Sequence, residues 1–154
     1  MNEPAPQALE FLPLREEHID SLLEIEHEAY PEPWTRSMFR DELNNKLSYF
    51  YVVFAGERIA GYTGFWLVLD EAHITTVVVK KEFRGQGLGR RLMEFILNKA
   101  VEVGARIATL EVRISNRRAR NLYDSLGFHI AGVRRGYYPQ TGEDAIVMFK
   151  ELDA

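Results

Sequence analysis

The 154-residue sequence predicts a mixed α/β fold, in which helices flank one mixed and mostly antiparallel sheet. Three observations lead to this prediction. Segments 16–29 and 88–103 repeat apolar residues at helical spacing. Short runs rich in β-branched and aromatic residues, separated by turn residues, indicate strands that are joined as hairpins. Alternate glycines also separate a valine run from the second helical segment, a pattern typical of a strand, a tight turn and a helix start.

The chain is expected to form one domain, residues 9–154, after a flexible lead-in of residues 1–8. This length is enough to bury roughly two thirds of the unfolded surface in one core. The expected order of elements is β-α-α-β-β-β-α-β-α-β-β. The strands are predicted at residues 9–14, 49–55, 59–69, 72–80, 107–113, 129–135 and 145–150.

The connections between these elements predict their directions. The three strands between residues 49 and 80 follow one another through short turns, so they should form an antiparallel meander. Strand 107–113 follows a helix and should therefore run parallel to the strand before that helix. Residues that cap or end helices stand at the expected boundaries, namely Pro31, Pro33, Thr35, Gly104, Ser115 or Asn116, and Gly127.

Composition limits the classes of function. The formal net charge of −4 argues against a general nucleic-acid binder. The absence of cysteine excludes disulfides, thiolate metal sites and a cysteine nucleophile, and it fits a reducing compartment. The apolar runs are too short to span a membrane, and the N-terminus lacks the apolar core of a signal peptide. We expect a cytoplasmic protein without a membrane partner or direct contact with nucleic acid, and we favour a monomer.

The glycine-rich turn at residues 85–89 predicts an anion site. Glycine adopts backbone conformations closed to other residues and lets the backbone approach a ligand closely. The first amides of the following helix lack partners within it, and the helix dipole places partial positive charge there. The turn therefore suits a phosphate, with Arg84 and Arg90 adding charge at its rim. The alternative is a turn that only starts a helix.

Comparison with known phosphate-binding motifs helps to decide between an anion site and a turn that only starts a helix. The dinucleotide fingerprint fails because Arg90 stands where it needs a third glycine, and the P-loop motif needs a longer loop. Arg84, Gly87 and Gly89 do form the pattern R-x-x-G-x-G behind a hydrophobic strand. This pattern resembles the acyl-CoA pyrophosphate loop of the GCN5-related N-acetyltransferases, the GNAT superfamily. The resemblance implies the GNAT fold and acetyl-CoA as cosubstrate.

Two further residues are candidates for chemistry, and each has a structural alternative. Side chains alternate along strand 107–113, so Glu111 shares a face with Arg113 while its direct neighbours point to the other face. A carboxylate in mid-strand is either partly solvated, paired with Arg113, or functional. Tyr123 lies on the next helix, where a tyrosine is more often a core residue with its hydroxyl at the rim.

The segment that holds both residues reads LEVRISNRRARNLYDSLGF from Leu110 to Phe128. It resembles the RimI-type ribosomal-protein alanine N-acetyltransferases of the GNAT superfamily. Pro33-Trp34 upstream resembles the same group, as do residues 135–138, 143–145 and Met148 downstream. The similarity spans about residues 34–148. One departure is the strand that often reads Asn-Ile-Ala-Val in that group, because residues 76–79 read Thr-Val-Val-Val here.

The resemblance implies transfer of acetyl from acetyl-CoA to the N-terminal residue of a protein. The expected residue is alanine, and the expected protein is small-subunit ribosomal protein 18. By matching position, Glu111 would be the general base and Tyr123 the general acid. Trp34, Tyr137 and Tyr138 would border the peptide entrance. The residues that would hold the cosubstrate are Val77, Val78, Val79, Arg84, Gly85, Gln86, Gly87, Leu88, Gly89, Arg90 and Asn116.

These residue types suit the reaction. Attack on a thioester needs a neutral amine, and at pH 7 about a tenth of α-amines are neutral, against well under a thousandth of lysines. A glutamate can take the remaining proton, and a tyrosine can protonate the leaving thiolate. No metal is required, and the four histidines lack ligand spacing and are expected at the surface. The alternatives are a related enzyme that acts on small-molecule amines or lysines, and a non-catalytic acyl-CoA-binding module.

Overall fold

The computed structural model describes residues 8–152 and confirms the predicted α/β class. Its strands form a seven-stranded sheet, in which hydrogen-bonded neighbours follow the order β1 (Glu10–Pro13), β2 (Ser48–Ala55), β3 (Arg58–Val68), β4 (Glu71–Val79), β5 (Ile107–Arg113), β7 (Glu143–Glu151) and β6 (His129–Tyr138). β4 (Glu71–Val79) and β5 (Ile107–Arg113) pair in parallel, as predicted for strands joined through a helix. The pairs β1 with β2, β5 with β7 and β6 with β7 are antiparallel. The predicted lead-in, residues 1–8, lies outside the described residues apart from Ala8.

The chain forms two compact units, each with buried apolar side chains of its own. One contains Met1–Gly64 and Thr76–Leu92, and the other contains Phe65–Thr75 and Met93–Ala154. Strands β3 (Arg58–Val68) and β4 and helix α3 (Leu88–Glu102) contribute residues to both units. The expectation of a single domain stays a prediction.

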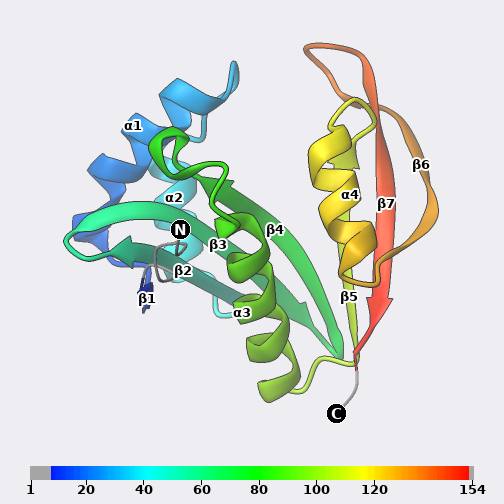
Figure 1. Cartoon of the computed structure of the whole chain (residues 1–154), viewed down its shortest axis with the longest axis horizontal. Helices are drawn as coiled ribbons and strands as arrows, with labels where there is room; N and C mark the ends of the chain where they lie inside the picture. Colours follow the sequence, from blue (N-terminus) through cyan, green and yellow to red (C-terminus); the bar gives the residue numbers. More distant parts are fainter. Residues whose placement is uncertain (1–7, 153–154) are drawn as a thin grey trace, which may run out of the picture. The chain divides into compact units, whose positions relative to one another are not determined.

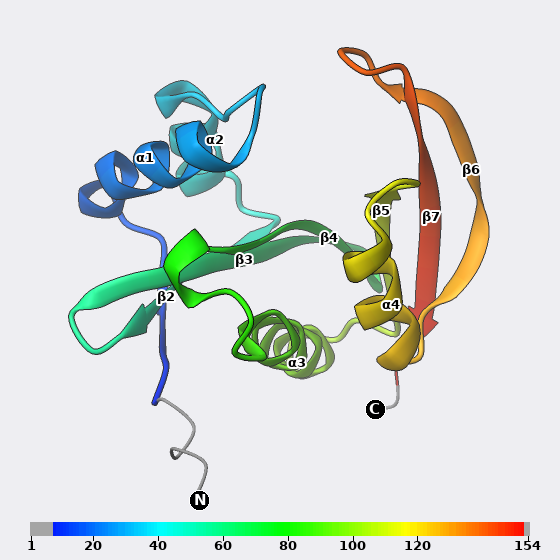
Figure 2. The ribbon, with the colours of Figure 1, turned by 45° about the horizontal axis from the view of Figure 1, so that its top comes forward.

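Strand β2 (Ser48–Ala55) divides the core of the first unit between two faces. Val52 is buried on one face in a cluster with Tyr62 of β3 and residues of the first two helices. Val53 is buried on the other face in a cluster with Leu88 and Leu92 at the start of α3. Figure 2 shows the first two helices over one face of β2 and β3. β1 (Glu10–Pro13) pairs with β2 at the edge of the sheet.

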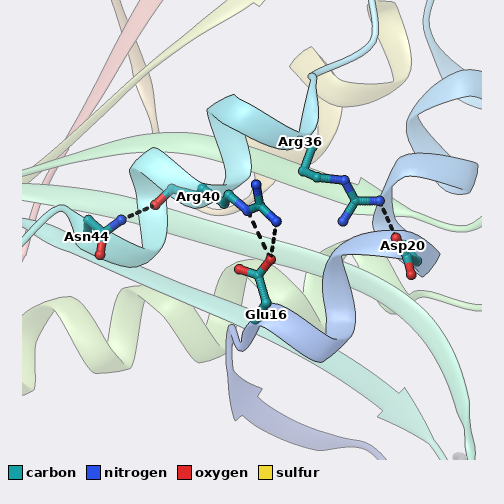
Figure 3. Close-up of polar contacts among 5 residues, drawn as sticks. All are labelled: Glu16, Asp20, Arg36, Arg40 and Asn44. Atoms are coloured by element: carbon teal, nitrogen blue, oxygen red, sulfur yellow. Dashed lines mark hydrogen bonds and ion pairs between the residues drawn. The ribbon is translucent and has the colours of Figure 1, made fainter.

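The predicted first helix is a short 3-10 turn, η1 (Glu16–His18), followed by α1 (Ile19–Ala29). The predicted cap of α2 (Arg36–Asn44) is confirmed, because the Thr35 hydroxyl accepts a hydrogen bond from the Met38 amide at 3.3 Å. Ion pairs join the helices at their exposed side: Arg40 donates to Glu16 at 2.9 Å, and Arg36 pairs with Asp20 (Figure 3). Exposed ion pairs of this kind contribute little, about 0–1 kcal/mol each.

A buried carboxylate fixes the corner between α1 and α2. Glu26 is only 4% exposed. It accepts hydrogen bonds from the Trp34 amide at 2.8 Å and from the Tyr62 hydroxyl. Burial raises the pKa of Tyr62, and the hydrogen bond to Glu26 raises it further. Because a buried charge is costly without partners, this network holds the backbone at Trp34 in place.

In the second unit, β6 (His129–Tyr138) and β7 (Glu143–Glu151) form a hairpin that is longer than predicted. Every residue of β6 is exposed or half-buried, so the strand has no alternation of buried apolar residues that the sequence could reveal. The pairing extends to Tyr138 opposite Glu143. Helix α4 (Arg117–Ser125) lies beside β5 and β7 (Figure 1).

One prediction about the histidines is wrong. His18 is buried, with 7% exposure, and its Nδ1 accepts a hydrogen bond from the Arg15 amide at 3.0 Å. Burial lowers the pKa of His18. His73 is half-buried and bonded to Glu111. Within residues 8–152, no helix has the length and apolar character needed to cross a membrane.

Candidate active site

The glycine-rich turn, predicted to hold an anion, lies in the first unit. Gly85 and Gly87 have positive φ angles of 79° and 77°, a region that side chains with a Cβ rarely adopt. A Cβ built at either residue meets nothing within 4 Å, so there is open space over both. α3 begins at Leu88, whose side chain is buried in the core. The buried Leu88 side chain therefore anchors the C-terminal end of the turn, where the first backbone amides of α3 lie.

Arg84 ties this turn to the strand before it. Its Nε donates a hydrogen bond to the carbonyl oxygen of Val79, the last residue of β4, at 3.1 Å. The sequence predicted only that this arginine adds charge at the rim of the turn. In the structure, the Arg84 side chain also links the turn to the end of β4 through this hydrogen bond.

The backbone of β4 at residues 76–79 is held by β3. The buried Thr63 hydroxyl donates to the Thr76 carbonyl at 2.9 Å. A Cβ on Gly61 would lie 2.2 Å from the Val78 carbonyl oxygen, so only glycine permits this approach. The Val78 side chain is itself part of the buried cluster with Tyr62. The extra bulk of Val78 relative to the related pattern is thus accommodated in the core.

In the second unit, Glu111 lies in the middle of β5 with a side chain that is 14% exposed. Its neighbours Leu110 and Val112 are buried on the opposite face, as the alternation predicted. Glu111 Oε2 lies 2.6 Å from His73 Nε2 on β4. Arg134 Nε of β6 lies 3.8 Å from the other carboxylate oxygen. Glu111 is thus a partly shielded carboxylate with a polar partner at each oxygen.

The alternative in which Glu111 pairs with Arg113 is wrong. Arg113 instead forms an ion pair with Glu143 at 3.4 Å, and its guanidinium lies 3.9 Å from the centre of the Tyr138 ring. The cause is the register of β7, which places Ala145 opposite Arg113 and so brings Glu143 close to it. Burial raises the pKa of Tyr138, while the charge of Arg113 acts in the opposite direction.

The remaining predicted residues of the second unit lie on α4 and on the β6–β7 hairpin. Tyr123 is half-buried, with its ring centre 6.0 Å from that of the buried Phe128. Asn116 caps α4, because its Oδ1 accepts from the Ala119 amide at 3.2 Å. Tyr137 is 44% exposed, and its ring lies edge-on to that of Tyr138, with centres 5.0 Å apart.

The candidate residues therefore fall into two groups. The first unit contains Trp34 and residues 77–90, the predicted cosubstrate segment, and the second contains Glu111, Asn116, Tyr123 and the tyrosine pair. Trp34 is partly buried against Phe39, with ring centres 5.2 Å apart, so it also has a packing role. Among the described residues, no group of three or more histidine, aspartate or glutamate side chains is placed to hold a metal ion.

Sequence reasoning missed His73 and Arg134, the two partners of Glu111. His73 is 38 residues from Glu111, and the contact depends on the parallel register that sets His73 opposite Thr109. For His73, the only indication in the sequence was the predicted parallel pairing of β4 with β5.

Comparison with known proteins gives one family. The model of the family described as "Acetyltransferase (GNAT) family" matches residues 19–128. A Bacillus subtilis protein, provisionally named as a [ribosomal protein bS18]-alanine N-acetyltransferase, is 40% identical over 141 residues, which cover 91% of this chain and 93% of that protein.

Solved structures agree with this result. The crystal structure of the ribosomal-protein-S18-alanine N-acetyltransferase from Escherichia coli is similar with a TM-score of 0.87 and 32% identity, over 96% of each chain. Arabidopsis thaliana NAA60 in complex with acetyl-CoA has a TM-score of 0.85 over 96% of this chain and 100% of that one. At 16% identity, this second likeness concerns the fold alone.

Proposed function

The chain belongs to the acetyltransferase (GNAT) family and is an N-acetyltransferase, and on this premise we propose that it acetylates the N-terminal amine of a protein from acetyl-CoA. The first residue is alanine and the protein is ribosomal protein S18, the substrate named for its relatives in Bacillus subtilis and Escherichia coli. A substrate of this kind places the reaction in the cytoplasm.

The observation that carries the proposal is the environment of Glu111. Glu111 is a mid-strand carboxylate at 14% exposure, with His73 Nε2 2.6 Å from Oε2 and Arg134 Nε 3.8 Å from Oε1, so it is shielded yet reachable at Oε1. A neutral amine is needed for attack, and Glu111 can take its proton directly or through water. An α-amine suits such a base better than a lysine does, because its pKa of about 8 leaves more of it neutral at pH 7.

The glycine-rich turn fits the pyrophosphate of acetyl-CoA. Positive φ at Gly85 and Gly87, with open space over both, allows close approach of a phosphate to the backbone. In this proposal residues 84–90 hold the pyrophosphate, the backbone of Val77–Val79 holds the pantetheine arm, and Asn116 contacts the cosubstrate. When bound, acetyl-CoA supplies an activated acetyl thioester.

Tyr123 is assigned the complementary proton transfer. The departing thiolate has an intrinsic pKa near 8.5, and a phenol with an ordinary pKa of about 10 can protonate it. Tyr123 lies on the helix whose N-terminus Asn116 caps, so its position is fixed relative to β5 by that short connection. Trp34, Tyr137 and Tyr138 are assigned to the peptide entrance.

A panel of acceptors tests this proposal. Acetyl-CoA is incubated with peptides that begin with alanine, serine, glycine or methionine, with an Nα-blocked peptide that contains an internal lysine, and with spermidine. Products are identified by mass spectrometry, and kcat/KM is measured for each acceptor. We expect the alanine peptide to have the highest kcat/KM and the blocked peptide to be nearly inert. A polyamine that exceeds every peptide would assign the enzyme to small amines, and binding of acetyl-CoA without any transfer would assign it to a binding module.

A further inference from the structure

His73 forms the shortest contact that the structure gives to the carboxylate of Glu111. Its Nε2 lies 2.6 Å from Glu111 Oε2, and the His73 side chain is 35% exposed. A nitrogen and an oxygen at this distance require a proton between them, because two bare lone pairs would repel each other. Glu111 must be ionised to act as a base. The proton therefore belongs to the imidazole, and Nε2–H donates to the carboxylate.

The surroundings of His73 keep the ring in this orientation. The register of β4 and β5 places His73 beside Thr109, on the same face as Glu111 two residues further along β5. The Trp66 ring of β3 stands edge-on to the imidazole, with ring centres 6.5 Å apart and planes at 74°. Arg134 approaches the opposite oxygen, Oε1, at 3.8 Å. That distance is too long for a direct hydrogen bond and leaves lone pairs on Oε1 available.

We propose that His73 is a positioning residue for the general base: its Nε2–H bond to Oε2 fixes the Glu111 carboxylate so that Oε1 receives the proton of the substrate amine. The inference rests on the proposed role of Glu111. The proton passes from the ammonium nitrogen to Oε1, the nitrogen keeps the electron pair that attacks the thioester carbonyl, and His73 keeps its own proton throughout. A purely structural alternative is that the pair only joins β4 to β5.

A double-mutant cycle separates these alternatives. His73→Phe keeps a ring but has no donor, and His73→Gln places an amide N–H near the position of Nε2. We expect His73→Phe to lower kcat by about tenfold to a hundredfold, as for loss of one hydrogen bond to a charged group. Neither KM for the amine nor the Kd of acetyl-CoA should change by more than about twofold if positioning alone is lost. His73→Gln should recover part of the loss.

The decisive measurement is the same substitution in the Glu111→Gln background. If His73 acts through Glu111, His73→Phe should have almost no further effect on kcat there, because residues in one network are not additive. A pair that only joins β4 to β5 is also lost in Glu111→Gln, so the free energy of unfolding and the Kd of acetyl-CoA are measured beside kcat. A fall in either that accounts for the lower kcat of His73→Phe, or an equal further loss of kcat in the Glu111→Gln background, would overturn the inference. His129→Phe, at an exposed histidine of β6, is the matched control and should leave kcat unchanged.

Two arrangements keep this test independent of the proposed substrate. The cycle uses whichever amine the wild type acetylates fastest, so a polyamine substrate would defeat the peptide proposal while the His73 result stands. Long-range ¹⁵N NMR of the imidazoles needs no activity at all. We expect His73 to be protonated at Nε2 in the wild type, with a clear change of that resonance in Glu111→Gln. A bare Nε2, or a spectrum unaffected by Glu111→Gln, would overturn the inference.

Discussion

Replacing Gly61 by alanine tests whether the backbone of β4 holds the cosubstrate. A Cβ at this position would lie 2.2 Å from the Val78 carbonyl oxygen and 3.3 Å from the Val79 Cα. Both are backbone atoms, so no side-chain rotation can relieve the contact. Cβ atoms essentially never come within 3.0 Å of such a neighbour, which means that β3 and β4 must move apart by at least about 0.8 Å here.

This displacement is large compared with the tolerance of a hydrogen bond. Moving a group by about 0.8 Å can lengthen a hydrogen bond from about 2.9 Å to about 3.7 Å between donor and acceptor, which is too long for a hydrogen bond. Each hydrogen bond contributes about 0.5–1.5 kcal/mol. If the pantetheine arm makes two such bonds with residues 77–79, their loss costs about 1–3 kcal/mol, which weakens acetyl-CoA binding by roughly 5- to 150-fold. Overpacking should also lower the free energy of unfolding by about 1–3 kcal/mol.

Two other glycines provide graded controls. A Cβ on Gly64, in the same strand, would lie 2.9 Å from the Tyr49 carbonyl oxygen, so Gly64→Ala strains the contact with β2 and leaves Val78 untouched. A Cβ on Gly132 meets nothing within 4 Å. Acetyl-CoA affinity is measured by calorimetry and stability by urea unfolding. Wild-type affinity in Gly61→Ala, or an equal loss of affinity in Gly61→Ala and Gly64→Ala, would refute the assignment of residues 77–79 to the cosubstrate.

Three further predictions concern the base and acid, the turn and a buried histidine. Glu111→Gln should lower kcat/KM by about 10²–10⁴-fold, and this loss should become smaller as pH rises, because an alkaline medium supplies neutral amine. Tyr123→Phe should lower kcat/KM without recovery at high pH. Measuring kcat/KM against pH for one peptide distinguishes the two variants. Gly87→Ala should weaken acetyl-CoA binding in calorimetry, because a Cβ would stand where the phosphate approaches. Burial lowers the pKa of His18 below its unfolded value of about 6.5, so stability should be full above that pH and fall as pH drops through the folded-state value. Urea unfolding from pH 8 to 5 should show this slope, and His18→Asn should flatten it.

Each of these predictions has a contrary outcome. Equal alkaline rescue of Glu111→Gln and Tyr123→Phe would remove the division of labour between them. Gly56→Ala introduces similar strain, with φ of 65° and no neighbour within 4 Å, at a turn that has no proposed ligand. An equal loss of acetyl-CoA affinity in that variant would trace the effect of Gly87→Ala to strain. An unchanged slope in His18→Asn would show that other groups cause the pH dependence.

The elements of the fold were predictable because their signals are local. Thr35 caps α2 as predicted, Asn116 rather than Ser115 caps α4, and Gly104 follows α3 with a φ of 100°. The parallel pairing of β4 with β5 followed from the helix between them. The length of β6 was not predictable, because a mostly exposed edge strand lacks the apolar alternation on which such a prediction depends.

For the candidate site, the sequence could predict the face on which Glu111 lies but not the contacts of its side chain. Alternation correctly placed Glu111 away from the buried face of β5, but it could not say which charged group lies beside it. Arg113 is the nearest arginine along the chain, yet β7 brings Glu143 to it. The partners of Glu111 come instead from β4 and β6, at positions 73 and 134. A strand pattern determines the face of a side chain, whereas its neighbours depend on the register of strands distant in sequence. This is why Glu111 could be proposed as a general base from the sequence resemblance, while the residue proposed to orient it had to come from the structure.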